Sequence, residues 1–479
     1  MIDALLAASH SDATLFCTPG HRRGRSIPAS MERLMGSQAY SADLPDLPGF
    51  NLFESEGFIA SAQIRAAQLF GADRTWFLAN GSTVGVMAAI LATCGPGDKI
   101  ILPRNVHTSA ISGLILSGAH PIFINPEYDP DWDLVHCITP YTVARALDRH
   151  PDAKAIFMVS PTYHGVCGDV GAIAHLAHQQ NIPLIVDEAH GAHFGFHADL
   201  PAAALTSGAD FAVQSTHKTL SALTQASLLH QKSSLVDPRR VGSALQILQS
   251  SSPSNLLLAS LEGACQQMSA DGPALMSQTL AIARTARAGI GKIAGLSILQ
   301  KPEAPTAGFF DLDPTRLTVD VSALGLDGFR ADEICTEQFG IVAELPTLRH
   351  LTFIVSLGNR SEDIDRLFYA LRHLPQQSTL ATHKVSRLAG WPPTTHICHP
   401  ARSPREAFFA PRVSVPIDRA PERVSAETLC PYPPGIPVIL PGEAIAPEAI
   451  AFLQQIQAAG GLIAGCADPT LQSIQVIQD

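Results

Sequence analysis

Leu184-Ile-Val-Asp-Glu-Ala-His190 is an apolar run that ends on charged residues, and Gln214-Ser-Thr-His-Lys218 closes another such run further along the chain. Both belong to a series of short, β-rich apolar segments that alternates with helical patterns between about residues 60 and 230. This alternation is typical of an α/β fold, in which helices cover both faces of a mostly parallel sheet. Ligands of such sheets bind beyond the carboxyl ends of the strands, so the residues after each run are the candidates for chemistry.

The chain divides into five segments by pattern and composition. The clearest expected strands are Lys99–Pro103, Ala155–Ser160, Pro183–Asp187 and Phe211–Gln214, and the helices between them are Val84–Thr93, Thr142–Arg149 and Gly171–Gln180. Residues 255–290 predict a long helix. The expected organisation is an N-terminal segment (1–60), a large domain (61–290), a smaller α/β domain (291–375), a linker or arm rich in proline, histidine and basic residues (376–415), and a C-terminal α+β domain (416–479).

The composition narrows the classes of function. The formal net charge is −11 and there is no basic stretch, which argues against nucleic acid as a partner. Charged residues make up 16% of the chain, below the roughly 25% of an average soluble protein, which favours burial between subunits. No basic leader and no apolar run long enough to span a membrane are present, and the nine cysteines include no C-x-x-C pair. We therefore expect a cytoplasmic protein without membrane contact.

Lys218 and Asp187 are the strongest candidates for catalysis. A lysine amine condenses with an aldehyde only when it is unprotonated, and a desolvated site at a strand end depresses its pKa enough to allow this. An aspartate that ends a buried strand can pair with the protonated nitrogen of a pyridine ring. Each residue also has a plainer interpretation, since such a lysine is usually a solvated surface residue and such an aspartate often caps a turn.

Two further features fit an anionic, aromatic ligand. Gly81-Ser82-Thr83 leads straight into an apolar helix. Free N–H groups at the helix start, the close backbone approach that glycine allows and two hydroxyls could together bind a phosphate. An ordinary helix cap has the same pattern. His107 follows the strand that ends at Pro103, where its ring could stack on a cofactor, and a lone histidine there is more often structural.

Taken in order, these motifs resemble the signatures of the Orn/Lys/Arg decarboxylases, enzymes of fold type I that use pyridoxal 5'-phosphate (PLP). The matching stretches cover almost the whole chain: Thr18–Gly24, Asp43–Gly57, Asn80–Thr83, Arg104–His107, Ser160–Gly165, Asp187–His193, Gln214–Lys218, Ser250–Ser254, Arg423–Glu427, Pro431–Gly435 and Pro441–Glu443. The chain departs from relatives at Thr108, at His164 and at Glu422-Arg-Val424, and the first two lie near enough to the expected site to affect substrate preference. It also leaves no room for the N-terminal wing domain of the large members, so we expect a short form.

The resemblance implies a role for each motif residue. Lys218 would form the Schiff base, Asp187 would pair with the pyridine nitrogen, and His107 would stack on the ring. The phosphate would be held by Gly81, Ser82, Thr83, Ser215 and His217, and Ala189 and His190 would line the cofactor. Hydroxyls of the Ser250–Ser252 stretch, Ser250 and Ser251 among them, would reach the phosphate of a neighbouring subunit. These roles imply a homodimer, or a dimer-based oligomer, with its active site at the subunit interface.

The implied reaction is removal of the α-carboxylate of a basic amino acid, with Lys218 or His217 returning a proton to Cα. Arginine, lysine and ornithine remain open as substrates. A distal cation in a partly desolvated pocket needs a carboxylate. The candidates for it are Asp43, Asp46, Glu54, Glu56 and Glu344.

Other functions remain to be weighed against this one. PLP-dependent aminotransferases and carbon–sulfur lyases share this fold. They stay open as alternatives because the bond that breaks depends on the orientation of the substrate on the cofactor. A catalytically silent PLP protein is a further alternative. A metal hydrolase is another alternative, because potential metal ligands lie close together in the sequence at Asp187, Glu188, His190, His193 and His197. No H-E-x-x-H motif places two ligands on one helix, so we expect no metal. The helicase-like string Asp-Glu-Ala-His lacks the phosphate loop that would accompany it.

Overall fold

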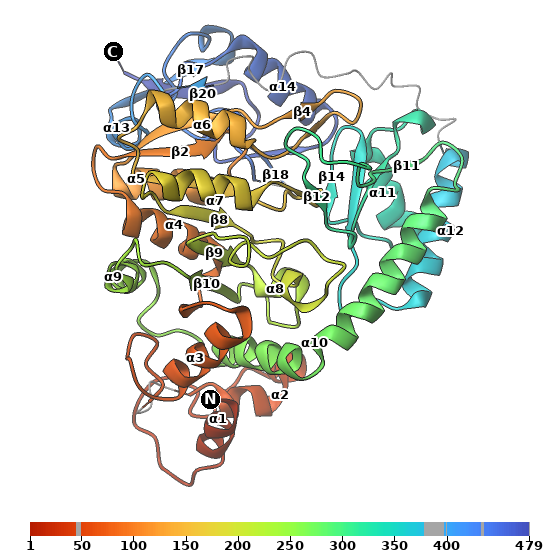
Figure 1. The fold of residues 1–479 in the computed structure, drawn as a ribbon. Helices are drawn as coiled ribbons and strands as arrows, with labels where there is room; N and C mark the ends of the chain where they lie inside the picture. The colour runs from red at the N-terminus through yellow and green to blue at the C-terminus, as the bar shows by residue number, and fades with distance from the viewer. Residues whose placement is uncertain (45–48, 378–396, 399, 433–434, 479) are drawn as a thin grey trace.

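A computed structural model describes residues 1–44, 49–377, 397–398, 400–432 and 435–478 (Figure 1). Its centre is an eight-stranded sheet in the order β1-β10-β9-β8-β6-β2-β3-β16. The strands are β1 (Arg74–Leu78), β2 (Lys99–Pro103), β3 (His120–Ile124), β6 (Ala155–Val159), β8 (Leu184–Asp187), β9 (Phe211–Gln214), β10 (Ser227–Gln231) and β16 (Ile397–Cys398). The five strands from β9 to β3 run parallel and the outer ones antiparallel, which confirms the expected mostly parallel sheet.

Both faces of this sheet are buried, which explains why its strands read as continuous apolar runs. Successive residues of a strand point to opposite faces. In β6, Phe157 therefore packs into a core with α4 and α5, while Ile156 and Met158 pack into another with α6 and α7. The helices are α4 (Gly81–Thr93), α5 (Thr108–Ser117), α6 (Pro140–Arg149), α7 (Val170–Gln179) and α9 (Pro238–Leu248). The strands and helices expected in this region are confirmed, with ends shifted by up to three residues.

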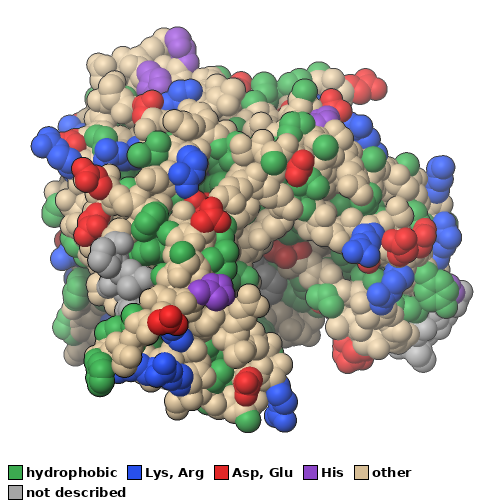
Figure 2. All heavy atoms as spheres, turned by 90° about the horizontal axis from the view of Figure 1, so that it is seen from below, with side chains coloured by type: hydrophobic (Ala, Val, Ile, Leu, Met, Phe, Trp, Pro, Cys, Tyr) green, Lys and Arg blue, Asp and Glu red, His purple; other side chains and the backbone are tan. Residues whose placement is uncertain are grey.

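Helix α10 (Asn255–Ile290) leads from the large domain to the small one, as the sequence predicts (Figure 1). The small sheet is entirely antiparallel, in the order β11-β13-β15-β14, and shares its core with two helices of its own and with the end of α10. Its elements are β11 (Ser297–Ile298), β13 (Arg316–Asp320), α11 (Gly328–Phe339), β14 (Leu345–Pro346), β15 (His350–Ile354) and α12 (Ser361–Gln377). A pairing of β12 (Asp311–Leu312) with β7 (Val166–Cys167) ties this domain to the large one. The small domain forms a separate lobe, with a hollow between it and the main body (Figure 2).

The N-terminal helices α1 (Ile2–Ser9), α2 (Ala29–Ala42) and α3 (Phe58–Phe70) pack on the start of α10. Glu262 of α10 holds the start of α1 there, because its buried carboxylate accepts from the Met1 amino group at 3.2 Å and from the Ile2 N–H at 2.7 Å. None of the helices in the described residues combines the length and apolarity needed to cross a bilayer.

Residues 397–398 and 400–415 hold more regular structure than a linker or arm would. β16 adds an edge strand beside β3, and α13 (Pro404–Phe409) packs against α5. A capping box starts α13, since the Ser403 hydroxyl accepts from the Glu406 N–H while the Glu406 carboxylate accepts from the Ser403 N–H. Of the expected linker, residues 378–396 and 399 lie outside the described part of the chain.

The C-terminal unit combines helix α14 (Pro447–Ala458) with short antiparallel strand pairs around one apolar core. β17 (Arg412–Pro416) pairs with β20 (Ser473–Ile477), and β18 (Cys430–Tyr432) pairs with β19 (Leu462–Ala464). The segment after β18 reaches the large sheet, where the Thr108 N–H donates to the Gly435 carbonyl at 3.2 Å. The C-terminal unit therefore closes over the carboxyl edge of the large sheet.

Candidate active site

Lys218 and Asp187 line one cavity at the carboxyl edge of the large sheet. Asp187 is the last residue of β8, and Lys218 lies in the single helical turn α8 (Thr216–Thr219) directly after β9. Because β8 and β9 are parallel neighbours, their following residues meet at one edge. The cavity is lined by Ser82, Asn105, His107, Ser109, Val159, Pro161, Tyr163, Asp187, Ala189, His190 and Lys218.

The amine of Lys218 is held in surroundings that favour its neutral form. Its Nζ lies 3.0 Å from Nε2 of His190 and 5.7 Å from the ring centroid of Tyr163. Burial lowers the pKa of Lys218, and the Arg316 charge adds to this, while Asp187 and Glu344 oppose it. The direction of this shift is the one that Schiff-base chemistry requires.

Asp187 caps the turn that follows its strand and also lines the cavity. Its Oδ1 accepts from the Ala189 N–H at 3.2 Å, so the residue does cap the turn that follows the strand. Burial raises the pKa of the Asp187 carboxyl group, and a positive charge on His107 or Lys218 would act in the opposite direction. A cationic group placed in the cavity would therefore stabilise the ionised carboxylate.

His107 caps helix α5 with its ring. Nδ1 accepts from the Ser109 N–H at 3.2 Å and lies 2.9 Å from the Ser109 hydroxyl. Burial lowers the pKa of the imidazole. The ring is thus neutral, lines the cavity and lies against Gly435, where an added Cβ would come within 3.2 Å of it.

The start of helix α4 offers an anion site beside the cavity. Its N-cap, Asn80, makes no side-chain capping bond, and Gly81 has a φ of +78°, which a residue with a Cβ rarely adopts. The hydroxyl of Ser215 donates to that of Ser82 at 2.8 Å, and the buried hydroxyl of Thr216 has no hydrogen-bond partner within the described residues. Free N–H groups with polar hydroxyls are the donors that a phosphate needs.

Other expected cofactor residues lie further from the cavity. Thr83 is exposed on the first turn of α4, and His217 donates from Nδ1 to the Ala226 carbonyl at 2.9 Å. Ser250 and Ser251 are exposed, and the Ser250 N–H donates to the Asn80 side chain of the same chain at 3.3 Å. None of these four lines the cavity. Ala189 and His190 line the cavity.

Among the candidate carboxylates for a distal cation, Glu344 is the one near Lys218. Its charge acts on the pKa of Lys218 and on that of His217. Asp43 instead pairs with His21 at 3.1 Å. Glu54 accepts from the Asn51 side chain at 3.2 Å, Glu56 is exposed, and Asp46 lies outside the described residues.

The acidic residues and histidines of the Asp187–His197 stretch contact different partners. Glu188 accepts from the Ala204 N–H and from the Gln214 amide, both at 2.7 Å, and burial raises its pKa to about 8. His193 pairs with Asp313, and His197 contacts the Ser277 hydroxyl at 3.1 Å. Within the described residues these side chains form no cluster that could hold a metal ion.

Several residues of the site were not assigned from the sequence, among them Tyr163, which lines the cavity, and Arg316, which contacts His190. Tyr163 follows the strand that ends at Val159, so the strand-end rule could have singled it out. Burial raises the pKa of its phenol, which keeps the hydroxyl protonated. Arg316 lies behind His190 and comes from the small domain, and no local pattern marks it.

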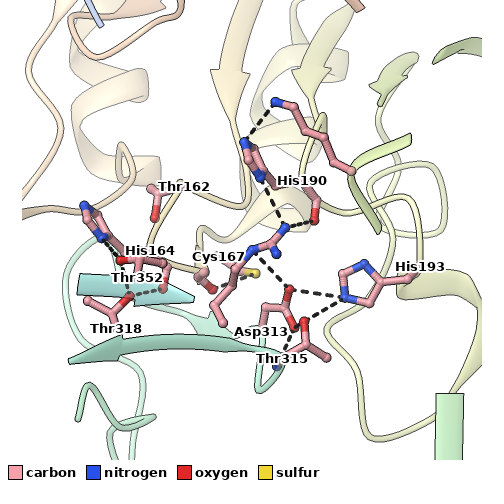
Figure 3. Close-up of polar contacts among 12 residues, drawn as sticks. Thr162, His164, Cys167, His190, His193, Asp313, Thr315, Thr318 and Thr352 are labelled. Carbon is pink, nitrogen blue, oxygen red and sulfur yellow. Dashed lines mark hydrogen bonds and ion pairs between the residues drawn. The ribbon is translucent and has the colours of Figure 1, made fainter. Parts of the chain in front are cut away.

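A buried polar network supports the cavity from below (Figure 3). Arg316 donates from Nη2 to Nδ1 and to the carbonyl of His190, both at 3.1 Å. Asp313 lies 3.9 Å from Nε of Arg316 and 3.2 Å from Nε2 of His193, and it accepts from the Thr315 hydroxyl at 2.7 Å. Burial alone would raise the pKa of Asp313, but His193, Arg316 and Thr315 lower it to about 2.

Comparison with known families agrees with this geometry. A family model described as the Orn/Lys/Arg decarboxylase major domain matches residues 1–363, and a model of the C-terminal domain of the same family matches residues 393–470. The chain belongs to the Orn/Lys/Arg decarboxylase family. The protein is accordingly a decarboxylase, and its fold is the α/β fold of PLP fold type I.

Individual members show how far the likeness extends. An arginine decarboxylase of Bacillus subtilis is 39% identical over 467 residues, which cover 97% of this chain and 94% of that protein. A lysine decarboxylase of Pseudomonas aeruginosa is 26% identical over 89% of this chain and 71% of its own. The solved structure of a lysine decarboxylase of Francisella novicida has a TM-score of 0.82 at 22% identity, and the match covers 99% of this chain and 80% of that one. The family likeness therefore includes the C-terminal unit.

Proposed function

We propose that this Orn/Lys/Arg decarboxylase uses PLP to convert arginine to agmatine and CO2. The observation that carries the reaction type is the buried Lys218, whose pKa is lowered by burial and which lies beside a buried carboxylate and an uncapped helix start. The likeness to an arginine decarboxylase at 39% identity, against 26% for a lysine decarboxylase, supports arginine over lysine. Ornithine would be the remaining substrate of the family.

The residues present fit PLP at each of its functional groups. Lys218 would hold the aldehyde carbon, Asp187 the pyridine nitrogen, and the start of α4 with Ser82 and Ser215 the phosphate. The unpartnered hydroxyl of Thr216 and the uncapped helix α4 are donors that a bound phosphate would satisfy. When bound, PLP supplies an electron sink for the bond that breaks at Cα.

The proton that returns to Cα is assigned to Lys218 rather than to His217. Lys218 lines the cavity, whereas His217 does not, and the Nδ1 proton of His217 is engaged by the Ala226 carbonyl. His107 would stack on the cofactor ring, and Tyr163 would orient the substrate from the wall of the cavity.

The distal cation of the substrate is assigned to Glu344. Its charge acts on Lys218, so a guanidinium that extends from the reacting end can reach the carboxylate. A guanidinium and a carboxylate can form two parallel hydrogen bonds, which favours arginine over the point charge of lysine.

We also propose a homodimer that completes the phosphate site, with the exposed Ser250 and Ser251 facing the partner. The low charged fraction and the exposure of these hydroxyls support it. A cytoplasmic location is proposed as well, and it is supported by the free thiols of the cysteines, such as Cys94 and Cys265.

Product analysis tests this function. The purified enzyme, loaded with PLP, should release CO2 and agmatine from arginine, with slower turnover of lysine and ornithine. Norleucine, which lacks the distal cation, should react more slowly than arginine because it forms no ion pair with Glu344. Borohydride should fix the cofactor onto Lys218, as peptide mass spectrometry would show. Amino transfer to a keto acid without CO2, or equal rates with norleucine, would refute the assignment.

A further inference from the structure

The two ring nitrogens of His190 contact groups of opposite hydrogen-bonding character. Nδ1 lies 3.1 Å from Nη2 of Arg316, and Nε2 lies 3.0 Å from Nζ of Lys218. A guanidinium has only donors, so Nδ1 must present its lone pair to Arg316. Burial lowers the pKa of His190 well below its usual range, and the charges of Lys218 and Arg316 act in the same direction. The ring is therefore neutral, and its single proton must sit on Nε2.

The position of this proton decides the state of Lys218. An Nε2–H group donates, so Nζ of Lys218 must accept, which only an uncharged amine can do. A protonated Lys218 would need the lone pair of Nε2, and the ring proton would then move to Nδ1, directly against an N–H of Arg316. Protonation of Lys218 thus breaks the hydrogen bond between His190 and Arg316.

The surroundings of Arg316 keep its guanidinium in contact with Nδ1 of His190. Its side chain is fully buried at the start of β13, Nη2 also donates to the His190 carbonyl at 3.1 Å, and Asp313 balances its charge. The side chain does not line the cavity, so it acts on Lys218 only through His190 and through its charge. Nη1 is buried without a hydrogen-bond partner within the described residues, so that nitrogen forms no competing bond that would draw the guanidinium away.

We propose that Arg316 is a positioning residue that fixes His190 in its Nε2-protonated form, and that His190 thereby keeps the amine of Lys218 free to attach the cofactor. In that attachment the amine forms a C–N bond to the aldehyde carbon of PLP and the aldehyde oxygen leaves as water. The proposal rests on the function proposed above, because it assumes that Lys218 is the attachment point.

Several charged groups besides His190 act on Lys218 and must be kept constant in a test. Asp187 and Glu344 raise the pKa of Lys218, and Arg316 lowers it by its charge. His107 and His217 carry lowered pKa values themselves, so both are neutral near pH 7. A substitution of Arg316 therefore changes both the charge and the tautomer of His190, and two variants are needed to separate them.

The first measurement is direct. The apoenzyme with ¹⁵N-labelled histidine should show His190 as a neutral ring protonated on Nε2, and a His190→Phe variant would assign the signal. The same signal in an Arg316→Met variant should move toward the Nδ1-protonated form. A wild-type His190 that is protonated on Nδ1 would overturn the proposal without any reference to activity.

The second measurement compares Arg316→Gln with Arg316→Met. Both remove the charge, but only glutamine keeps an N–H that can donate to Nδ1. The rate at which each apoenzyme captures added PLP should be recorded from pH 6 to 10 by visible absorbance. Because the neutral amine is the reactive species, the methionine variant should capture PLP about tenfold more slowly than the glutamine variant near pH 7, and the two should converge at high pH.

The control variant is Arg349→Met. Arg349 also pairs with an aspartate of β13, Asp320, at 2.5 Å, but it makes no contact with His190. Its capture profile should match the wild type. Equal profiles for Arg316→Gln and Arg316→Met would overturn the role of Arg316, whereas a wild-type enzyme that fails to attach PLP at Lys218 would overturn the proposed function instead.

Discussion

Burial shifts Lys218 and Asp187 toward their neutral forms, and each then depends on a partner to set its charge. Lys218 is held neutral by His190 and Arg316, as its attachment to an aldehyde requires. Within the described residues, the side chain of Asp187 accepts a hydrogen bond only from the Ala189 N–H, so its carboxylate is left to pair with a cation in the cavity. The two residues at this sheet edge are thus prepared for opposite charge states.

Asp187→Asn should leave the fold and part of the PLP binding intact but lower turnover by about 100-fold, because a neutral amide cannot hold a proton on the pyridine nitrogen. Steady-state release of agmatine and the absorbance of bound cofactor would be measured together. Asp199→Asn is the control, since Asp199 is exposed and pairs with Arg284 outside the cavity. Near-normal turnover of Asp187→Asn would remove this residue from the mechanism.

Asp313 links pH to stability. Its pKa is about 2 in the folded protein against 3.8 for an unperturbed aspartate, so its contribution is complete above about pH 4 and is lost as the pH falls toward 2. Asp313→Asn should cost about 3–5 kcal/mol at pH 7, because Arg316 would be left buried without its counter-charge. Urea unfolding at pH 7 and pH 3 checks this, and the variant should lose less stability between these pH values than the wild type does. An equal loss in both proteins would contradict the assignment.

At the level of elements, the site depends on how helix α4 sits on the sheet. Gly85 lies one turn beyond the expected phosphate cradle and faces β1 and β9. A Cβ at this position would come within 2.6 Å of Leu78 and 2.8 Å of Val213. The absence of a side chain lets the helix start lie close enough for Ser82 to meet Ser215.

Gly85→Ala should push α4 away from the sheet, destabilise the protein by about 1–3 kcal/mol and weaken PLP binding. Gly242→Ala is the matched control, because Gly242 lies in helix α9 with no atom within 4 Å of its added Cβ, and the protein should gain up to about 1 kcal/mol. Thermal unfolding and PLP titration would follow both. A Gly85→Ala protein with unchanged affinity would show that α4 does not set the cradle.

For the whole molecule, the C-terminal unit and the large domain form one body around the site. Arg104, three residues before His107, donates to the Pro437 and Val438 carbonyls at 2.8 and 2.9 Å and to Glu443 at 2.8 Å. Next to the cofactor cavity, a larger and mainly apolar cavity is lined by all three domains and shares Asn105, Val159 and Tyr163 with it. The position of the C-terminal unit therefore affects access to the reacting groups.

The proposed dimer can be tested by subunit mixing. A Lys218→Ala chain cannot attach PLP, and a Ser250→Ala, Ser251→Ala chain should bind it weakly. If the two serines serve the partner's phosphate, random mixing restores one intact site in each mixed dimer, or about a quarter of all sites. PLP retained after dialysis would be counted. Retention no higher than the average of the two parents, or an active monomer in light scattering, would contradict the interface.

The sequence alone determined the parallel sheet and the edge at which the chemistry lies. Apolar runs that alternate with helical patterns are local signals, and the residues after such runs meet wherever the strands are parallel neighbours. Lys218, Asp187 and His107 were singled out in this way, and Ser82 because it stands at the start of an apolar helix. Thr83 was grouped with them by sequence, but side chains on a helix turn by about 100° per residue, and this one points to solvent.

Only the tertiary structure decided which residues of the small domain contact or lie near the cavity residues. Arg316 meets His190 across 126 positions of the chain, and Glu344 reaches the surroundings of Lys218 from the small domain. Such pairs depend on how two domains dock, and no periodicity or spacing within either domain encodes that arrangement. The protonation of Lys218 follows from these contacts, because the tautomer of one buried histidine is set by the donor on its far side.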